Sequence, residues 1–274
     1  MVQKLPGDIY RSDLKLADGR DISYYDSSEI NRSAADKRNE EAQPGIGHLR
    51  LDPLVDEWVV IASHRQHRVF LPPKELCPLC ASKGDKLTEI PDKDYEVVVF
   101  GNRAPALTTP KGNFKLAQMS ALTTPNVDAA GACEVVCYTS DHSSSFAKLS
   151  EKQIRAVLEA WKDRDSALSK LPFIEQVYIF ENRGEEVGVT LSHPHGQIYA
   201  YSFLPPRIEK MLQVANDHLA KTGKVLLDEV IKREIKDEKR IISQNGEWIA
   251  YVPYAARYPF EIHISPLRGV SNMS

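Results

Sequence analysis

The sequence predicts an α+β fold built on a mostly antiparallel sheet. Several runs of β-branched and aromatic residues are bounded by turn residues, a pattern typical of strands. Loops connect these runs as often as helices do, which favours antiparallel pairing over a doubly wound parallel sheet. The runs are residues 58–63, 95–100, 133–140, 173–182, 197–203, 248–254 and 260–265.

Helices are predicted between some of these strands. In residues 150–170, Ser150 and Gln153 have the spacing of a capping box, and apolar residues then recur on one face. Residues 205–223 open with prolines, carry apolar residues at helical spacing and end on a glycine. Residues 226–240 form a third helical pattern. These helices are expected to flank the sheet.

Composition excludes several classes of protein. Of the 274 residues, 42% are hydrophobic and 27% charged, so a disordered chain or a fibre is not expected. The net charge of −3 leaves no basic surplus for nucleic-acid binding. No run of 18 apolar residues occurs, and the first residues have no apolar leader, so neither a membrane partner nor secretion is expected. With only four cysteines, the sequence predicts a cytoplasmic location.

The chain is expected to have three parts. Residues 1–45 are polar and predict an arm lying on another part of the molecule, or a frayed terminus. Residues 57–70 resemble residues 247–260, a weak internal repeat that chance similarity between strands could also produce. Residues 46–204 then form a first repeat, and residues 205–274 form helices and the start of a second, apparently incomplete one.

The segment His193-Pro194-His195-Gly196-Gln197 is the most informative in the sequence. At the start of a strand, alternate residues face the same way, so both imidazoles and the amide are expected on one side. Pro194 stiffens the run, and Gly196 lets a ligand approach the backbone. An imidazole here could act as metal ligand, general base or nucleophile. The alternative is a polar strand edge exposed to water.

The second signal is the pair Cys77 and Cys80 in a CxxC motif. A closed zinc site needs four nitrogen or sulfur ligands, so two more must come from elsewhere. A redox pair or plain structural thiols are the alternatives. Candidates for the other two ligands are His142 and His193, with Cys133 and Cys137 as competitors that a strand core would also explain.

Three further segments could bind phosphate or a base. Arg65 and Arg68 follow a strand and could clamp a diphosphate, although a solvated loop explains them as well. A glycine-containing loop of hydrogen-bond donors, which an ordinary hairpin would also explain, precedes the double histidine. Its candidate phosphate-binding residues are Asn182, Gly188 and Thr190. Phe100 and Asn102 end a strand, where an aromatic ring beside an amide suits a stacked base, or merely a turn.

Together, HPHGQ preceded by ENRG, with CPLC, SDHS and WVVIASHRQHR, resembles the galactose-1-phosphate uridylyltransferase family. This family is the transferase branch of the histidine-triad superfamily, and the resemblance runs from about residue 48 to the C-terminal end. It implies two histidine-triad-like repeats, a nine-stranded sheet and a homodimer. It also implies a double displacement in which a uridylyl group moves from UDP-glucose to galactose 1-phosphate, giving glucose 1-phosphate and UDP-galactose.

The resemblance assigns roles by position. His195 would be the nucleophile, and Gln197 would donate to a non-bridging phosphoryl oxygen. Arg65 and Arg68 would hold the diphosphate. The α-phosphate pocket would contain Asn182, Gly188 and Thr190, and the uridine side Phe100 and Asn102. One Zn²⁺ would be bound by Cys77, Cys80, His142 and His193.

Two departures from the family pattern affect these expectations. The glutamate of a second metal site falls on Met211, with Glu209 near, so no second metal is expected. Family members also continue past the segment that ends this chain. The expectation is therefore either a fragment of a longer product or a chain that folds incompletely and is inactive. A truncated, inactive nucleotide-binding zinc protein is one alternative function. The second alternative function is a related nucleotidyl transferase or phosphorylase acting on another nucleotide.

Overall fold

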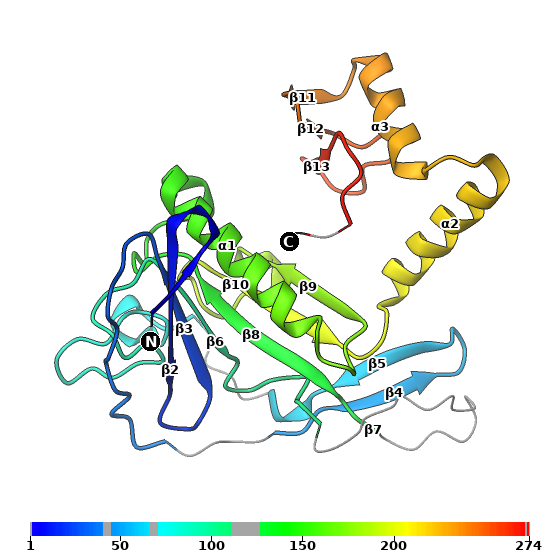
Figure 1. The fold of residues 1–274 in the computed structure, drawn as a ribbon. Coiled ribbons are helices and arrows are strands. Elements are labelled where there is room, and N and C mark those ends of the chain that lie inside the picture. Colours follow the sequence, from blue (N-terminus) through cyan, green and yellow to red (C-terminus); the bar gives the residue numbers. More distant parts are fainter. Residues whose placement is uncertain (1, 41–44, 66–70, 111–126, 272, 274) are drawn as a thin grey trace. The chain divides into compact units, whose positions relative to one another are not determined.

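The computed structural model describes residues 2–40, 45–65, 71–110, 127–271 and 273. Its largest sheet has seven strands in the order β1-β2-β3-β6-β8-β10-β9, and every neighbouring pair is antiparallel (Figure 1). Its strands are β1 (Val2–Leu5), β2 (Ile9–Lys15), β3 (Asp21–Asp26), β6 (Val97–Gly101), β8 (Gly131–Cys137), β9 (Gln176–Phe180) and β10 (His195–Tyr201).

Two further sheets have three strands each, in the orders β5-β4-β7 and β11-β12-β13, and they are also antiparallel. The predicted α+β class with a mostly antiparallel sheet is therefore confirmed, and each predicted strand overlaps an observed one. The strands of the two smaller sheets are β4 (His48–Asp52), β5 (Glu57–Ile61), β7 (Val127–Asp128), β11 (Ile241–Gln244), β12 (Trp248–Tyr251) and β13 (His263–Pro266).

The N-terminal region differs from the polar arm expected over residues 1–45. The strands β1, β2 and β3 extend the main sheet, so the expectation is wrong for the first half of this region. Ile22 and Tyr24 are buried on one face and Tyr25 on the other. Ser23 donates to Asp13 of β2, and Arg11 of β2 forms an ion pair with Asp163. Residues 29–40 have no regular secondary structure. The nine-stranded sheet implied by the family resemblance also differs from the seven-stranded sheet of the described residues.

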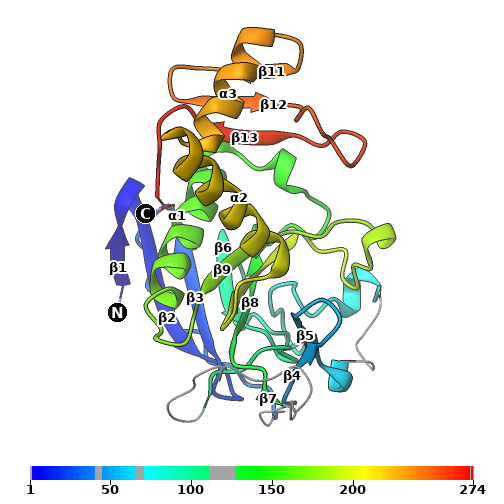
Figure 2. The same ribbon diagram turned by 90° about the vertical axis from the view of Figure 1, so that its right-hand side faces the viewer.

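Helix α1 (Glu151–Leu168) covers one face of the main sheet (Figures 1 and 2). It begins with the predicted capping box, in which Ser150 Oγ accepts from Gln153 N at 3.3 Å. Its buried face packs against Val136 of β8 and Ile198 of β10. Because successive residues of a strand point to opposite faces, the neighbours of Ile198 on β10 point away from α1.

Two layers cover that opposite face. The segment of residues 77–95, here called the metal loop, packs on Val98, Phe100 and Cys137. The small sheet of β4 and β5 packs near the other end, against Cys133 and Tyr199. In the β8–β10 register, His195 pairs with Cys137, Gln197 with Val135 and Tyr199 with Cys133. His195 and Gln197 therefore lie on this face between the two layers.

The chain divides into two compact units, Met1–Leu204 and Pro205–Ser274. The second unit contains α2 (Pro206–Thr222), α3 (Leu226–Asp237) and the sheet of β11, β12 and β13, with a small core of Ile231, Ile249 and Tyr251. Gly223 ends α2 in the left-handed conformation, as the sequence predicts. None of the helices in the described residues is both long and apolar enough to cross a membrane.

Candidate functional site

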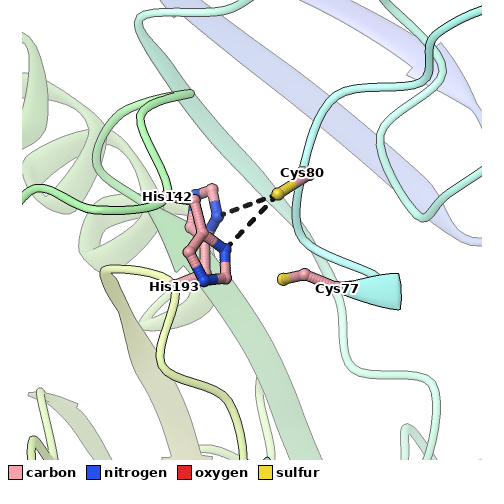
Figure 3. Close-up of side chains that lie close together, drawn as sticks. All are labelled: Cys77, Cys80, His142 and His193. Atoms are coloured by element: carbon pink, nitrogen blue, oxygen red, sulfur yellow. Dashed lines mark hydrogen bonds between the residues drawn. The ribbon is translucent and has the colours of Figure 1, made fainter. Parts of the chain in front are cut away.

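Four side chains from three separate segments meet on the sheet face opposite α1. The ligand atoms of Cys77, Cys80, His142 and His193 all lie within 4.8 Å of one another. Figure 3 shows the two cysteines on one side of the group and the two imidazoles on the other. Cys80 Sγ is 3.5 Å from His142 Nδ1 and 3.6 Å from His193 Nδ1. The structure thus brings together the four residues predicted as ligands.

The metal loop is folded back on itself behind the two cysteines. The Thr88 hydroxyl donates to the Cys80 carbonyl at 2.5 Å, and the Glu89 amide donates to the Pro78 carbonyl at 3.1 Å. Burial raises the pKa of Cys77 to about 11. A cation in contact with the sulfur is what would favour the thiolate there, so metal binding would release protons.

Hydrogen bonds fix the ring of His193, which is only 1% exposed. Its Nε2–H points at the Thr139 carbonyl and at the Tyr95 hydroxyl, both at 2.9 Å. The Tyr95 hydroxyl in turn donates to the Leu79 carbonyl at 2.9 Å. Because a carbonyl only accepts, Nε2 carries the proton and Nδ1 keeps its lone pair toward Cys80. An outer shell of this kind orients histidine ligands in metal sites.

The donor set suits a metal ion. Two thiols and two imidazoles form an S₂N₂ donor set, the kind that would bind zinc in a closed structural site. His142 is supported as well, because its Nε2 lies 3.3 Å from Ser192 Oγ. Among the described residues, this Cys/His group could hold a metal ion, because its four ligand atoms already lie close together.

His195 lies beside this group, at the first position of β10. Its Nδ1–H donates to the His193 carbonyl at 2.8 Å, so the lone pair of the neutral ring is on Nε2. Burial lowers the pKa of His195, which keeps the ring neutral near pH 7. A pocket of about 280 Å³ opens at this residue and is also lined by Asn182, Gly184 and Ser192. The arrangement places an uncharged imidazole with a free lone pair on Nε2 beside a small cavity.

Gln197 and Arg65 continue the same face away from His195. Gln197 is half-buried on β10, with its side chain on the side of His195. Arg65 Nη1 donates to the hydroxyl of Tyr199 at 3.0 Å, and the Arg65 Nε is buried without a partner. The structure therefore brings His195, Gln197 and Arg65 to one face. Arg68 lies outside the described residues.

The loop before β10 contributes unequally to the pocket. Asn182 lines it, whereas Gly188 and Thr190 are not among the residues around it. Gly188 has φ 73°, a left-handed conformation that favours glycine. The Thr190 carbonyl accepts from the Leu71 amide at 2.8 Å, so the backbone of Thr190 serves to hold the loop.

The base-side residues are placed differently from the sequence interpretation. Phe100 is 3% exposed and packs in the core under the metal loop, so its ring is not a free stacking surface. Asn102 follows directly, and its side-chain oxygen accepts from the Ala104 amide at 3.0 Å. Its backbone amide donates to the Cys133 carbonyl at 2.8 Å. In the structure Phe100 supports the segment and Asn102 forms its turn.

Sequence reasoning missed residues that support the site. Tyr95 orients His193, and Ser192 contacts His142, but an isolated tyrosine or serine carries no spacing signal. Glu89 was missed for the same reason, although its carboxylate is nearly buried. A buried acid is rare unless paired, but burial at this position cannot be read from the sequence.

Comparison with known proteins places these features in a family. Residues 36–205 match the profile described as "Galactose-1-phosphate uridyl transferase, N-terminal domain". The chain is 42% identical to the galactose-1-phosphate uridylyltransferase of Streptomyces lividans over 96% of this chain and 69% of that protein. It is 40% identical to that of Thermotoga maritima over 82% of this chain and 68% of that protein.

Solved structures are also similar to this chain. One described as "Structure of uridylyltransferase" has a TM-score of 0.68 and 29% identity, covering 82% of this chain and 68% of that one. An ADP-glucose phosphorylase from Arabidopsis thaliana with bound ADP-glucose has a TM-score of 0.59 and 26% identity, covering 83% of this chain and 70% of the other.

Proposed function

This chain belongs to the galactose-1-phosphate uridylyltransferase family, and we propose that it transfers a uridylyl group between UDP-glucose and galactose 1-phosphate through a covalent bond to His195. One observation carries the covalent step. The hydrogen bond from His195 Nδ1 to the His193 carbonyl leaves the lone pair of the neutral ring on Nε2, and His195 lines a pocket of about 280 Å³. A neutral imidazole is a good nucleophile near pH 7, and a phosphoramidate is reactive enough to pass the group on.

The proposed reaction has two displacements at the α-phosphorus of the nucleotide. In the first, Nε2 of His195 forms a bond to phosphorus, the bond from phosphorus to the bridging oxygen breaks, and glucose 1-phosphate leaves with that oxygen. In the second, a phosphate oxygen of galactose 1-phosphate attacks phosphorus and the N–P bond breaks. UDP-galactose leaves and His195 returns to its neutral form. Nδ1 of His195 keeps its proton and its hydrogen bond to the His193 carbonyl, which holds the ring in place in both steps.

The surrounding residues would bind charge and the base. Gln197, on the same face as His195, would donate its amide N–H to a non-bridging oxygen as charge develops there. Arg65 and Arg68 would hold the diphosphate, and Asn182 would reach the α-phosphate from the pocket wall. Gly188 and Thr190 would shape the loop that carries Asn182. Asn102 would face the uracil, with Phe100 as its support.

Zinc is the metal that best suits the Cys77, Cys80, His142 and His193 group, since thiolate and imidazole ligands favour it. Bound there, it would act as a structural ion that fixes His193 two residues from the nucleophile. The residues of the chain would do the rest. Tyr95 and Thr139 hold the imidazole of His193, and the His193 carbonyl holds His195.

Three further features are part of the proposal. Residues 46–204 would form the first histidine-triad-like repeat with the metal and catalytic groups, and residues 205–274 the start of a second. The chain would act as a homodimer, which light scattering on the purified protein would test. The cytoplasm is proposed because Cys77, Cys80, Cys133 and Cys137 are all free thiols.

The direct test uses UDP-glucose labelled in the uridylyl group. Incubation with the wild-type chain should leave acid-labile label on the protein and release one glucose 1-phosphate for each label. His195→Ala should leave none, whereas His218→Ala, a histidine of α2 paired with Glu229, should label normally. A folded, metal-loaded wild-type protein that takes no label would contradict the covalent step.

The relative with bound ADP-glucose suggests a second candidate, a nucleotidyl transferase or phosphorylase acting on another nucleotide. The same labelling experiment with ADP-glucose separates the two. Labelling from UDP-glucose alone, with discharge by galactose 1-phosphate, supports the uridylyl reaction. Labelling from ADP-glucose with discharge by inorganic phosphate would favour the phosphorylase instead.

A further inference from the structure

A nearly buried carboxylate in the metal loop binds two arginines from the N-terminal part of the chain. Glu89 has 7% of its side chain exposed. Arg20 Nη2 lies 2.6 Å from its Oε2, and Arg38 Nη1 lies 2.6 Å from its Oε1. Arg20 and Arg38 are themselves 16% and 7% exposed. Charges this far from water cost free energy unless they are paired.

Each arginine also reaches a second part of the molecule. Arg20 Nη1 donates to the Gly101 carbonyl at 2.7 Å, next to Asn102 on the proposed base side. Arg38 binds the carboxylate of Asp36, which accepts from the Ala17 amide at 2.9 Å. The two arginines therefore tie the metal loop to the end of β6 and to the N-terminal β2–β3 hairpin.

Arg103 adds a weaker link on the same side. Its Nη1 lies 3.1 Å from Glu40 and 3.7 Å from Glu89. Arg103 is 46% exposed, so this link contributes less than the two buried pairs. It nevertheless joins the residue after Asn102 to the same carboxylate.

The backbone of Glu89 connects this network to the metal ligands. Its amide donates to the carbonyl of Pro78, which lies between Cys77 and Cys80. The residue before it, Thr88, donates its hydroxyl to the Cys80 carbonyl. Two hydrogen bonds, of 3.1 Å and 2.5 Å, thus connect residues 88 and 89 to the CxxC turn.

We infer that Glu89, Arg20 and Arg38 form a positioning hub that sets the metal loop and the base-side segment Gly101–Arg103 relative to each other. The N-terminal hairpin and arm supply both arginines, which gives this part of the chain a role in the site without contact to substrate. The base-side half of this inference rests on the proposed function; the metal half does not.

The test is Glu89→Gln in the full-length zinc-loaded protein, which keeps the shape but removes the charge. The rate of zinc release to a chelator should rise about tenfold, the lower end of the effect of losing outer support at a metal site. Binding of uridine monophosphate, measured by calorimetry, should weaken about tenfold as well, as the Gly101 segment loses its anchor. Arg38→Met, which leaves the Arg20 pair intact, should shift both quantities in the same direction by less.

The control is Asp163→Asn on the opposite face of the sheet. Asp163 accepts from Tyr25 at 2.6 Å and Arg11 at 2.9 Å, so it joins the same N-terminal hairpin to α1 instead of the metal loop. This variant should lower thermal stability but release zinc at the wild-type rate. Equal zinc release from Asp163→Asn and Glu89→Gln would show a merely structural effect and overturn the hub.

The remaining outcomes are also decisive. If Glu89→Gln does not fold, Arg38→Met gives the answer. Folded variants with wild-type zinc release and wild-type affinity for uridine monophosphate would overturn the inference. A wild-type protein that holds zinc but does not bind uridine monophosphate would contradict the proposed function. The zinc-release rates of Glu89→Gln and Asp163→Asn would then test the positioning hub without the binding measurement.

Discussion

Two loops meet at His193 and His195, and they are built in opposite ways. The metal loop, residues 77–95, is fastened by Glu89, by Tyr95 and by the hydrogen bond from Thr88 to Cys80. The loop of residues 181–192 before β10 is mostly exposed, and two of its glycines have positive φ. Among the described residues, its charged side chains Arg183, Glu185 and Glu186 make no ion pair.

The difference matches what each loop would do. A ligand set for a metal must be held at fixed distances, which requires buried and satisfied polar groups. A loop that closes around phosphate must instead admit and release substrate, and loops with few buried contacts open at low free energy. His193 lies with the rigid metal loop and His195 lies at the pocket lined by the exposed loop, although a single residue separates the two histidines.

The largest expected effect comes from removing the metal. Stripping zinc with a chelator should lower the free energy of unfolding by about 4 kcal/mol, the stabilisation from a ligand at a thousand times its Kd. Burial raises the pKa of Cys77 and makes its thiolate unfavourable without a cation, so the metal loop should loosen first. Hydrogen exchange would check this, because amides of residues 77–95 should lose protection while those of residues 181–192 change little. Equal loss in both loops would contradict the comparison.

A smaller effect is expected from Tyr95→Phe. This change removes the donor to the Leu79 carbonyl and one of the two acceptors at His193 Nε2, which keeps the Thr139 carbonyl. Leaving the buried Leu79 carbonyl without this donor costs about 1–3 kcal/mol. Thermal unfolding should show this loss, and zinc affinity should fall about tenfold. The matched control is Tyr178→Phe, since Tyr178 is 47% exposed on β9, and it should leave both quantities unchanged.

The sequence was sufficient for the parts of the fold with a strong local signal. Ser150 and Gln153 marked the start of α1 because a capping box is a contact between near neighbours. The alternation in HPHGQ correctly put Gln197 on the side of His195, because side-chain direction in a strand follows from its geometry. The four residues of the Cys/His group were selected through the family resemblance, since the residues alone left Cys133 and Cys137 as competitors.

The parts of the fold and of the site that the sequence did not predict depend on contacts between residues far apart in the chain. The strands β1 to β3 were missed because a residue such as Arg11 looks solvent-exposed in the sequence but pairs with Asp163, 152 residues along the chain. Phe100 was interpreted as a stacking ring because a strand end gives no information on which layer covers it. Glu89 could not be singled out, since its arginines lie 69 and 51 residues away.

The smallest expected effect, and the sharpest contrast with the metal loop, comes from Gly188→Ala. Gly188 has φ 73° and no atom near the place of an added Cβ, so the cost is confined to the backbone, about 1 kcal/mol. Gly246→Ala is the control, because Gly246 has equally open surroundings without a positive φ.

Thermal unfolding should barely separate the two variants, since strain in an open loop can relax within that loop. Kinetics should separate them clearly. A strained loop should hold Asn182 less well and raise the KM for UDP-glucose several-fold, with zinc release at the wild-type rate. Faster zinc release from Gly188→Ala would show that the two loops are one mechanical unit.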